Sequence, residues 1–491
     1  MFGAFINKVK APGVQNLVCI LVGVSIFCFV IYKSATTSLT HDESFTYLHF
    51  IPQKFMDIIS YKTPYTNNHI LNTLLIKGSE YLFGNSELAI RLPNNLSLIL
   101  YLTYTFLLLR KMNRQLIILP FLLMILNPYL IDFFGLARGY GLSIAFLMMS
   151  LYHLLNFFEK DKKKDLMLFN LGAFLAIFSY FTLVYFYLSA LIIFNLLLFV
   201  GKKNHNSGNL FRWIFKQNVI NLVFLIFIFL TAFEPFRRTM KSVPIDFGGK
   251  TGLIHDTIRS LLIKSYMGLP AFWISILTGF ICAVILALFL YLVYIVVRRN
   301  LSEMDRLKPV IIVNWLTVLT AILICLAHYI IDMDFPIQRF AIFIYPLIML
   351  NIISLTCLRI HKFKNIFTGL IVLLAILTVV NFGCKLNIRY YYDWTYDADT
   401  KSAMRALVQD YEQQPDKEAP ISLGVSWIFE PTMNYYRQLW KLNWLEPVDR
   451  EAPALKDDYI YVIRFEYQPT DLIEEQVIFT SAIADAMLVK R

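Results

Sequence analysis

The fold of this chain is decided by long apolar segments such as NLVCILVGVSIFCFVIYKSA at residues 16–35. About 20 apolar residues are enough to cross a bilayer as a helix. Lys8 and Lys10 precede this segment, which lacks a small-residue cleavage pattern and is longer than the apolar core of a signal peptide. We therefore expect a first transmembrane helix that is retained in the mature protein.

Ten further apolar segments follow along the chain. With the first, they are centred near residues 25, 100, 122, 148, 173, 191, 222, 284, 319, 348 and 374. The fifth and sixth are joined around Ser179–Thr182 with almost no polar break. The chain is 57% hydrophobic and only 16% charged, which leaves too little polar surface for a soluble protein of 491 residues. The sequence predicts an all-α polytopic membrane bundle of about 11 transmembrane helices over residues 1–385.

Basic residues recur in every second loop between these segments. They include Arg110, Lys160, Lys202, Arg298 and Lys364. Because cytoplasmic loops are rich in Lys and Arg, the pattern predicts a cytoplasmic N-terminus, with loops 36–87 and 233–269 outside. The basic loops are too short for a nucleotide-binding domain, and the net charge of +11 is spread over them in a way that does not indicate nucleic acid. We expect a bacterial inner membrane, with an endoplasmic reticulum membrane as the alternative, and membrane lipids as partners.

Residues 386–491 differ in composition from the rest and predict a small extracytoplasmic α/β domain. The expected helices are Ala398–Tyr411 and Pro431–Trp440, and the expected strands are Ile421–Val425, Tyr459–Arg464 and Gln476–Thr480. All six cysteines of the chain lie in the apolar segments without ligand spacing, so neither disulfides nor a thiolate metal site is expected.

An acidic motif follows the first apolar segment, in the stretch Thr40-His41-Asp42-Glu43-Ser44. A free Asp side chain has a pKa of about 3.9, so Asp42 would be ionised and able to accept a proton from an attacking hydroxyl. Adjacent Asp and Glu residues are also common at solvated helix ends, which is the alternative interpretation. Asp42 and Glu43 are our candidate catalytic residues.

The same loop carries a polar segment, Asn67-Asn68-His69, before an amphipathic stretch at residues 70–83 that is expected to lie flat at the membrane interface. Amide and imidazole groups there could bind sugar hydroxyls. Glu43 and His69 together are weak candidate ligands for a divalent metal ion. The alternative for Asn67 and Asn68 is a simple turn.

Arginines occur at several predicted outer helix ends. They are Arg91, Arg138, Arg237, Arg238 and Arg339. The planar fork of an Arg side chain donates two hydrogen bonds at once and is suited to phosphate. A single Arg at such a position can equally reach out to lipid headgroups. Their occurrence on the side of the acidic motif favours a cavity that binds phosphate.

In this order, these motifs resemble the GT-C superfamily of membrane glycosyltransferases, in particular the glycosyltransferase family 39-like group of protein mannosyltransferases and aminoarabinose lipid A transferases. The residues that carry the resemblance are Asp42-Glu43, Asn67-Asn68-His69, Phe83-Gly84, Arg91-Leu92-Pro93, Ala137-Arg138-Gly139-Tyr140 and, more faintly, Phe335–Phe340. The resemblance implies a GT-C-like fold, a polyprenyl-phosphate sugar as donor and inversion at the anomeric carbon.

The resemblance also implies residue roles. It makes Asp42 the base and gives Glu43 an assisting role in positioning. Arg138 and Arg339 would lie near the donor phosphate, with Arg237 and Arg238 as competitors for that role, and Tyr140 would be near the sugar. The His-rich motifs of protein mannosyltransferases are not evident in mid-chain, so a glycolipid or glycan acceptor is at least as plausible as a protein. A transporter of lipid-linked sugars and a glycan polymerase or ligase stay open as alternatives.

Overall fold

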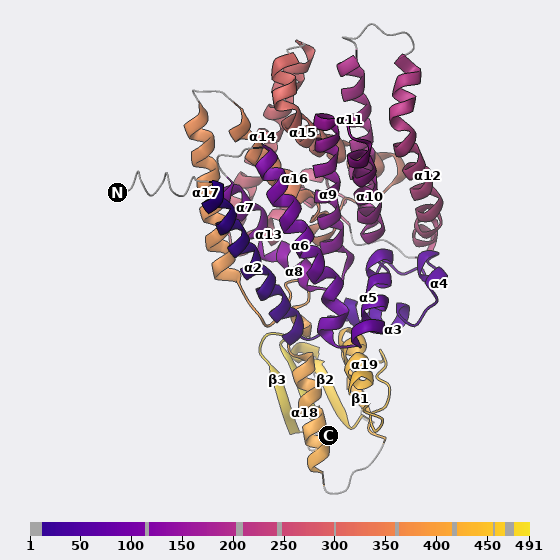
Figure 1. Cartoon of the computed structure of the whole chain (residues 1–491). Helices are drawn as coiled ribbons and strands as arrows, with labels where there is room; N and C mark the ends of the chain where they lie inside the picture. Colours follow the sequence, from indigo (N-terminus) through magenta and orange to yellow (C-terminus); the bar gives the residue numbers. More distant parts are fainter. Residues whose placement is uncertain are drawn as a thin grey trace. The chain divides into compact units, whose positions relative to one another are not determined.

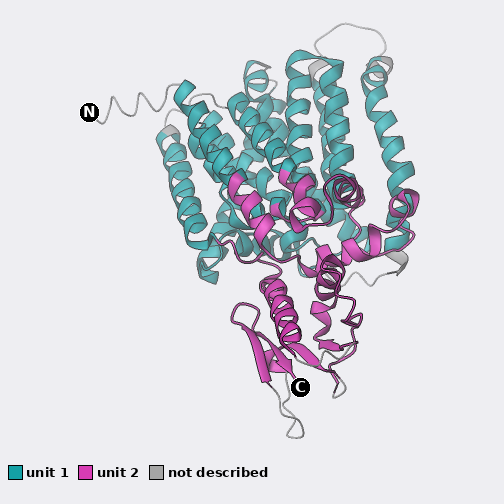
Figure 2. Ribbon diagram, turned by 60° about the horizontal axis from the view of Figure 1, so that its bottom comes forward, with its two compact units in different colours: residues 1–27, 96–134, 139–386 teal, residues 28–95, 135–138, 387–491 magenta. Residues whose placement is uncertain are grey.

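The structure is a computed structural model that describes residues 12–112, 117–202, 210–242, 248–298, 301–358, 363–414, 420–454, 457–466 and 476–491. It divides into two compact units, shown in Figure 2. Unit 1 comprises residues 1–27, 96–134 and 139–386, and unit 2 comprises residues 28–95, 135–138 and 387–491. Each unit is described separately.

Unit 1 is built from long helices, which are labelled in Figure 1. They are α2 (Pro12–Thr36), α6 (Glu87–Met112), α9 (Gly139–Lys160), α10 (Lys163–Ser179), α11 (Val184–Lys202), α12 (Leu210–Ser242), α14 (Ala271–Val297), α15 (Leu301–Ile331) and α17 (Lys364–Lys385), of which α2 and α6 extend into unit 2. Shorter helices are α7 (Ile118–Ile125), α8 (Pro128–Gly135), α13 (Ser260–Ser265) and α16 (Ile344–Ser354). The chain is a multi-pass membrane protein, and the predicted helical bundle is confirmed.

Each of the eleven predicted apolar segments lies on a helix, but the number of full spans is smaller. Among the described residues, eight helices are long and apolar enough to cross a membrane. The pair α7 and α8 forms a ninth span only if it is taken together, and it bends by 64°. The bend falls before Pro128, because the residue that precedes a proline is driven away from helical geometry. Between the fifth and sixth segments, where the sequence has almost no polar break, the helix is interrupted at Tyr180, whose backbone is extended.

Unit 2 joins the loop after α2 to the C-terminal part of the chain. The loop contains α3 (His41–Phe50), α4 (Phe55–Ile59) and α5 (Ile70–Phe83). The C-terminal part contains α18 (Thr400–Gln413), α19 (Glu430–Leu439) and a four-stranded sheet in the order β1 (Leu423–Val425), β2 (Tyr459–Ile463), β4 (Ala486–Lys490), β3 (Gln476–Ser481). Strands β1 and β2 are parallel, and the other pairs are antiparallel. The predicted helices and strands are present, and β4 was missed.

A single hydrophobic core connects the two parts of unit 2. It contains Leu39 and Ile76 from the loop together with Leu407, Phe429 and Tyr461 from the C-terminal part. Helix α19 packs against α3, as Figure 1 shows. The acidic motif at the start of α3 is therefore held by the C-terminal part of the chain.

Helix α5 coincides with the predicted amphipathic stretch at residues 70–83. Its buried side is largely polar and includes Asn72, Thr73 and Ser79. Tyr81 and Leu82 are instead 90% and 69% exposed. Ile70 and Ile76 are also buried, but the exposed apolar side chains of its last turn give the helix the polarity expected of one that lies in a membrane interface.

Candidate active site

The acidic motif starts α3 with a capping box. Thr40 is the N-cap residue, and its hydroxyl accepts a hydrogen bond from the backbone N–H of Glu43. In return, Glu43 Oε2 accepts a hydrogen bond of 2.9 Å from the backbone N–H of Thr40. This exchange satisfies two N–H groups that have no partner inside the helix. The local sequence thus fixes where α3 begins and which way its first carboxylates point.

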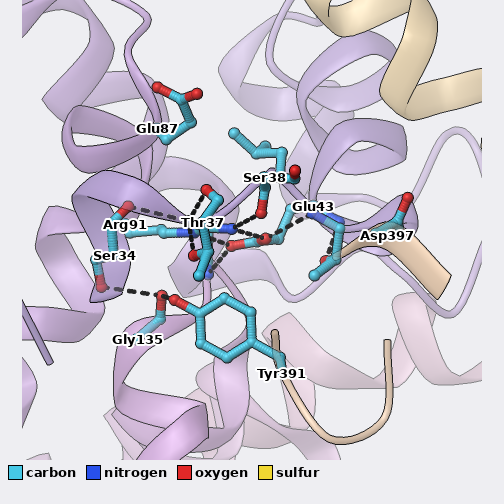
Figure 3. A network of polar contacts seen from close by, with 12 residues as sticks. Ser34, Thr37, Ser38, Glu43, Glu87, Arg91, Gly135, Tyr391 and Asp397 are labelled. Carbon is cyan, nitrogen blue, oxygen red and sulfur yellow. Dashed lines mark hydrogen bonds and ion pairs between the residues drawn. The ribbon is translucent and has the colours of Figure 1, made fainter. Parts of the chain in front are cut away.

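Glu43 is fully enclosed and ion-paired with Arg91. Arg91 donates from Nε to Oε1 at 2.9 Å and from a terminal nitrogen to Oε2 at 2.7 Å, and both side chains are 0% exposed. The backbone N–H of Ala137 also donates to Oε1, at 2.6 Å. With the Thr40 N–H, four hydrogen bonds reach this carboxylate, about as many as its lone pairs can accept. Glu43 therefore has a structural role in the loop, and Figure 3 shows its polar contacts.

The other N–H groups of Arg91 donate to the C-terminal end of α2 and to the residues that follow it. It donates to the carbonyl oxygens of Ser34 at 2.9 Å, Thr37 at 3.0 Å and Ser38 at 2.6 Å. The ring of Tyr391 lies 5.0 Å from the guanidinium carbon. These contacts direct Arg91 to the backbone, so the arrangement gives no support for Arg91 as a phosphate ligand.

Residues 135–138 join the same network through close backbone contacts. Tyr391 donates its hydroxyl to the carbonyl oxygen of Gly135 at 2.8 Å, and a side chain at Gly135 would place its Cβ 3.0 Å from that hydroxyl. Asn72 donates to the carbonyl oxygen of Ala137 at 2.8 Å. The segment is thus fixed on both sides, which determines the position of Arg138.

Asp42 lies close to Arg138 and Asn67. Its carboxylate is 3.6 Å from an Arg138 terminal nitrogen and accepts a hydrogen bond of 3.4 Å from the Asn67 side-chain amide. Arg138 also donates to the Asn67 side-chain oxygen at 3.3 Å and to its carbonyl oxygen at 3.3 Å. The Asp42 side chain is 12% exposed, whereas Glu43 is sealed. The structure brings together three residues predicted from separate motifs.

Asn68 and His69 take positions inside the loop. Asn68 donates to the carbonyl oxygen of Ile58 at 3.0 Å and accepts from the Thr73 hydroxyl at 3.1 Å. His69 is the N-cap residue of α5 and is buried. Within the described residues, no group of three or more His, Cys, Asp or Glu side chains could hold a metal ion. The suggested pairing of Glu43 and His69 with a metal stays a prediction.

Asp397 was not anticipated from the sequence. This residue from the C-terminal part accepts a hydrogen bond of 2.6 Å from the backbone N–H of His41, and it is 2% exposed. Burial raises the pKa of its carboxyl group well above the usual range, against the hydrogen bonds from His41 and Thr400 that lower it. Nothing in the sequence joins residues 41 and 397, so no local signal could have identified this contact.

The other predicted residues lie in unit 1, and their position relative to Asp42 stays a prediction. Arg237 and Arg238 both donate to the carboxylate of Glu234, at distances of 2.7 and 2.8 Å. Tyr140 is buried, and its ring centroid lies 6.3 Å from that of Phe340. Phe340 in turn lies under the guanidinium of Arg339, which is 5.2 Å from its ring centroid. The structure thus groups Tyr140 with the neighbourhood of Arg339, whereas Arg237 and Arg238 pair with Glu234.

Comparison with known proteins supports the resemblance stated above. Residues 68–231 match the family model described as dolichyl-phosphate-mannose-protein mannosyltransferase. None of the curated protein sequences matches the chain. Two solved structures of ArnT from Cupriavidus metallidurans are similar over 97% of both chains. The apo form has 9% sequence identity and a TM-score of 0.49, and the form bound to undecaprenyl phosphate has 11% and 0.48. The family-model match confirms the resemblance to the GT-C superfamily of membrane glycosyltransferases.

Proposed function

We propose that this chain is a membrane glycosyltransferase that moves a sugar from a polyprenyl-phosphate donor to an acceptor hydroxyl, with Asp42 as general base. The observation that carries the proposal is the difference in burial and hydrogen bonding between two adjacent carboxylates. Glu43 is sealed and saturated by hydrogen bonds, whereas Asp42 keeps partial exposure beside Arg138 and Asn67. The family match over residues 68–231 supports the same reaction class.

In this mechanism Asp42 takes the proton of the acceptor hydroxyl as its oxygen attacks C1 of the donor sugar. The new C1–O bond forms as the bond between C1 and the phosphate oxygen breaks, and the electron pair leaves with the polyprenyl phosphate. Attack opposite to the leaving phosphate inverts C1. Arg138, 3.6 Å from Asp42, stabilises the carboxylate before proton transfer. In this proposal it also interacts with the leaving phosphate, which develops negative charge.

Asn67 has a positioning role in this proposal. Its side-chain amide donates to Asp42, and its two oxygens accept from Arg138. The base and the cation are therefore held in one arrangement by a single residue. Holding reacting groups at fixed distances supplies a large share of enzymatic acceleration.

The orientation of the chain is also part of the proposal. The basic loops favour a cytoplasmic N-terminus, which puts the loop that carries Asp42 and the C-terminal part outside the cytoplasm. A polyprenyl-phosphate donor suits that compartment, because the reaction then needs no nucleotide. We propose a bacterial inner membrane and a glycolipid, glycan or protein as acceptor.

The test is transfer of label from a radiolabelled polyprenyl-phosphate hexose or pentose by purified protein in lipid, with envelope extract as the acceptor source. The wild type is compared with Asp42→Asn and with Asp57→Asn as a matched control. Asp57 lies in the same loop and makes a surface ion pair of 3.5 Å with Lys62. We expect transfer by the wild type and the control only. Equal transfer by Asp42→Asn would remove Asp42 as the base, and lipid binding without transfer by any of the proteins would favour a transporter.

A further inference from the structure

Helix α3 carries a row of aromatic rings on one side, next to the acidic motif. His41, Phe45 and His49 are four residues apart and so share one side of the helix. The rings of Phe45 and His49 stack with centroids 4.2 Å apart, and Tyr65 meets Phe45 edge-on at 5.5 Å. Burial lowers the pKa of His41, so this ring is neutral at neutral pH. The row begins at the residue that precedes Asp42.

The row continues onto the C-terminal part of unit 2. Trp427 meets His41 edge-on with ring centroids 5.8 Å apart, and Trp427 is 55% exposed. The guanidinium of Arg450 lies 5.7 Å from the ring centroid of Phe45. Trp427 follows β1 by two residues. It therefore stands beyond the carboxyl end of the parallel pair β1 and β2, where ligands bind in open α/β sheets.

A cavity of about 430 Å³ opens at this place. Trp427, Arg450, Glu451, Glu466 and Arg491 are among the residues that line it. The two arginines are donors and the two glutamates are acceptors, so the charged groups balance. One glutamate, Glu466, already accepts a hydrogen bond of 2.5 Å from Ser426.

This lining matches one chemical class of ligand better than others. Sugar hydroxyls both donate and accept hydrogen bonds, and the apolar face of a sugar ring can pack on an aromatic side chain. A phosphate or carboxylate ligand would face the two glutamates as well as the arginines. A lipid chain would remove water from the four charged groups of the lining without offering them hydrogen bonds, which costs free energy.

We infer that the surface formed by Trp427, His41, Phe45 and Tyr65, together with this cavity, binds neutral sugar rings of the acceptor. The inference rests on the proposed function for the role of those sugars: the acceptor chain is held along the aromatic row, and its hydroxyl reaches Asp42. The binding itself requires no chemistry at Asp42.

The experiment measures binding directly, by saturation-transfer NMR of the full-length protein in nanodiscs. The probes are neutral oligosaccharides of glucose, galactose, mannose and N-acetylglucosamine, with galacturonic acid oligomers as the anionic comparison. The variants are Trp427→Ala, Phe45→Ala and Asp42→Asn, with Tyr81→Ala as an exposed-aromatic control. We expect at least one neutral probe to bind, with Kd at least fivefold weaker in Trp427→Ala and Phe45→Ala and unchanged in Asp42→Asn and Tyr81→Ala.

Three outcomes would overturn the inference. They are the absence of binding by every neutral probe, equal binding by wild type and Trp427→Ala, and binding of the anionic oligomers alone. A second measurement tests the lipid alternative: if brominated lipids quench a fluorescence component that disappears in Trp427→Phe, the ring lies in the bilayer and the inference fails. Because the Asp42→Asn protein is expected to bind without transfer, loss of the proposed function and loss of the sugar surface give different results.

Discussion

Replacing Glu43 by Gln removes the negative partner of Arg91 while it preserves size and capping ability. Both side chains of the pair are 0% exposed, so the guanidinium would stay buried without a counter-charge. Breaking a buried pair in this way costs about 3–5 kcal/mol. In a unit of roughly 150–250 residues, each kcal/mol corresponds to about 2–4 °C in Tm. We therefore expect the Tm of Glu43→Gln to fall by about 10 °C.

The assay is thermal unfolding of the purified protein in a fixed lipid or detergent, followed by tryptophan fluorescence. Asp42→Asn is the matched comparison, because it removes a carboxylate from the adjacent position, where the side chain is 12% exposed. We expect a smaller fall in Tm for this variant than for Glu43→Gln, because the Asp42 carboxylate is 3.6 Å from Arg138, whereas Glu43 and Arg91 are 2.7 Å apart and fully enclosed. The double variant Glu43→Gln/Arg91→Met removes both charges and should recover part of the loss. A Glu43→Gln protein as stable as the wild type would refute the assignment of Glu43 as the structural carboxylate.

Three further predictions concern the site. Arg138→Ala should lower kcat/KM for the donor by about 10²–10³-fold, the usual effect of removing one group that stabilises developing charge. Arg138→Lys should recover part of this loss. Wild-type kinetics in Arg138→Ala would contradict the proposed role of Arg138. Asp42→Glu moves the carboxylate by about one C–C bond, roughly 1.5 Å, so we expect about a 10²-fold loss of transfer with unchanged Tm. Full activity of this variant would mean that the position of the base is not critical. Because burial raises the pKa of Asp397, the unfolded state ionises first, and wild-type stability should decline as pH rises above about 4 toward the folded-state pKa. Asp397→Asn cannot ionise and keeps an oxygen for the His41 N–H, so its Tm measured from pH 4 to 8 should lack this decline, and parallel curves for both proteins would refute the assignment.

Periodicity and polarity predicted the long helices and most of the C-terminal elements, but not the short helices α3 and α4. The apolar segments gave the helices of unit 1, because a membrane allows few other solutions for a long apolar stretch. The bounds of α5, Ile70–Phe83, coincide with the predicted amphipathic stretch. Strand β4 was missed, because Ala486–Lys490 is short and is stabilised by pairing with β2 and β3 rather than by its own pattern.

Long-range contacts could not be predicted from the sequence. The structure brings Asp42, Asn67 and Arg138 into contact, and their role as a site stays a prediction. That Asp397 binds the first turn of α3 depends on packing between segments more than 350 residues apart, which no single sequence displays. The different environments of Asp42 and Glu43 could not be predicted either, because both residues carry the same charge and occupy adjacent positions.

The geometry of a helix explains how two neighbouring carboxylates acquire different environments. Successive residues of an α-helix point about 100° apart, so when Glu43 turns inward to Arg91, Asp42 turns toward Arg138 and Asn67. The capping box fixes that rotation, because Glu43 must reach back to the Thr40 N–H. Glu43 thus sets the direction of Asp42, the residue that we propose as the base. At a solvated helix end, both acids would face water. Here one of the two is enclosed against an arginine, and this asymmetry favours a catalytic interpretation of the motif.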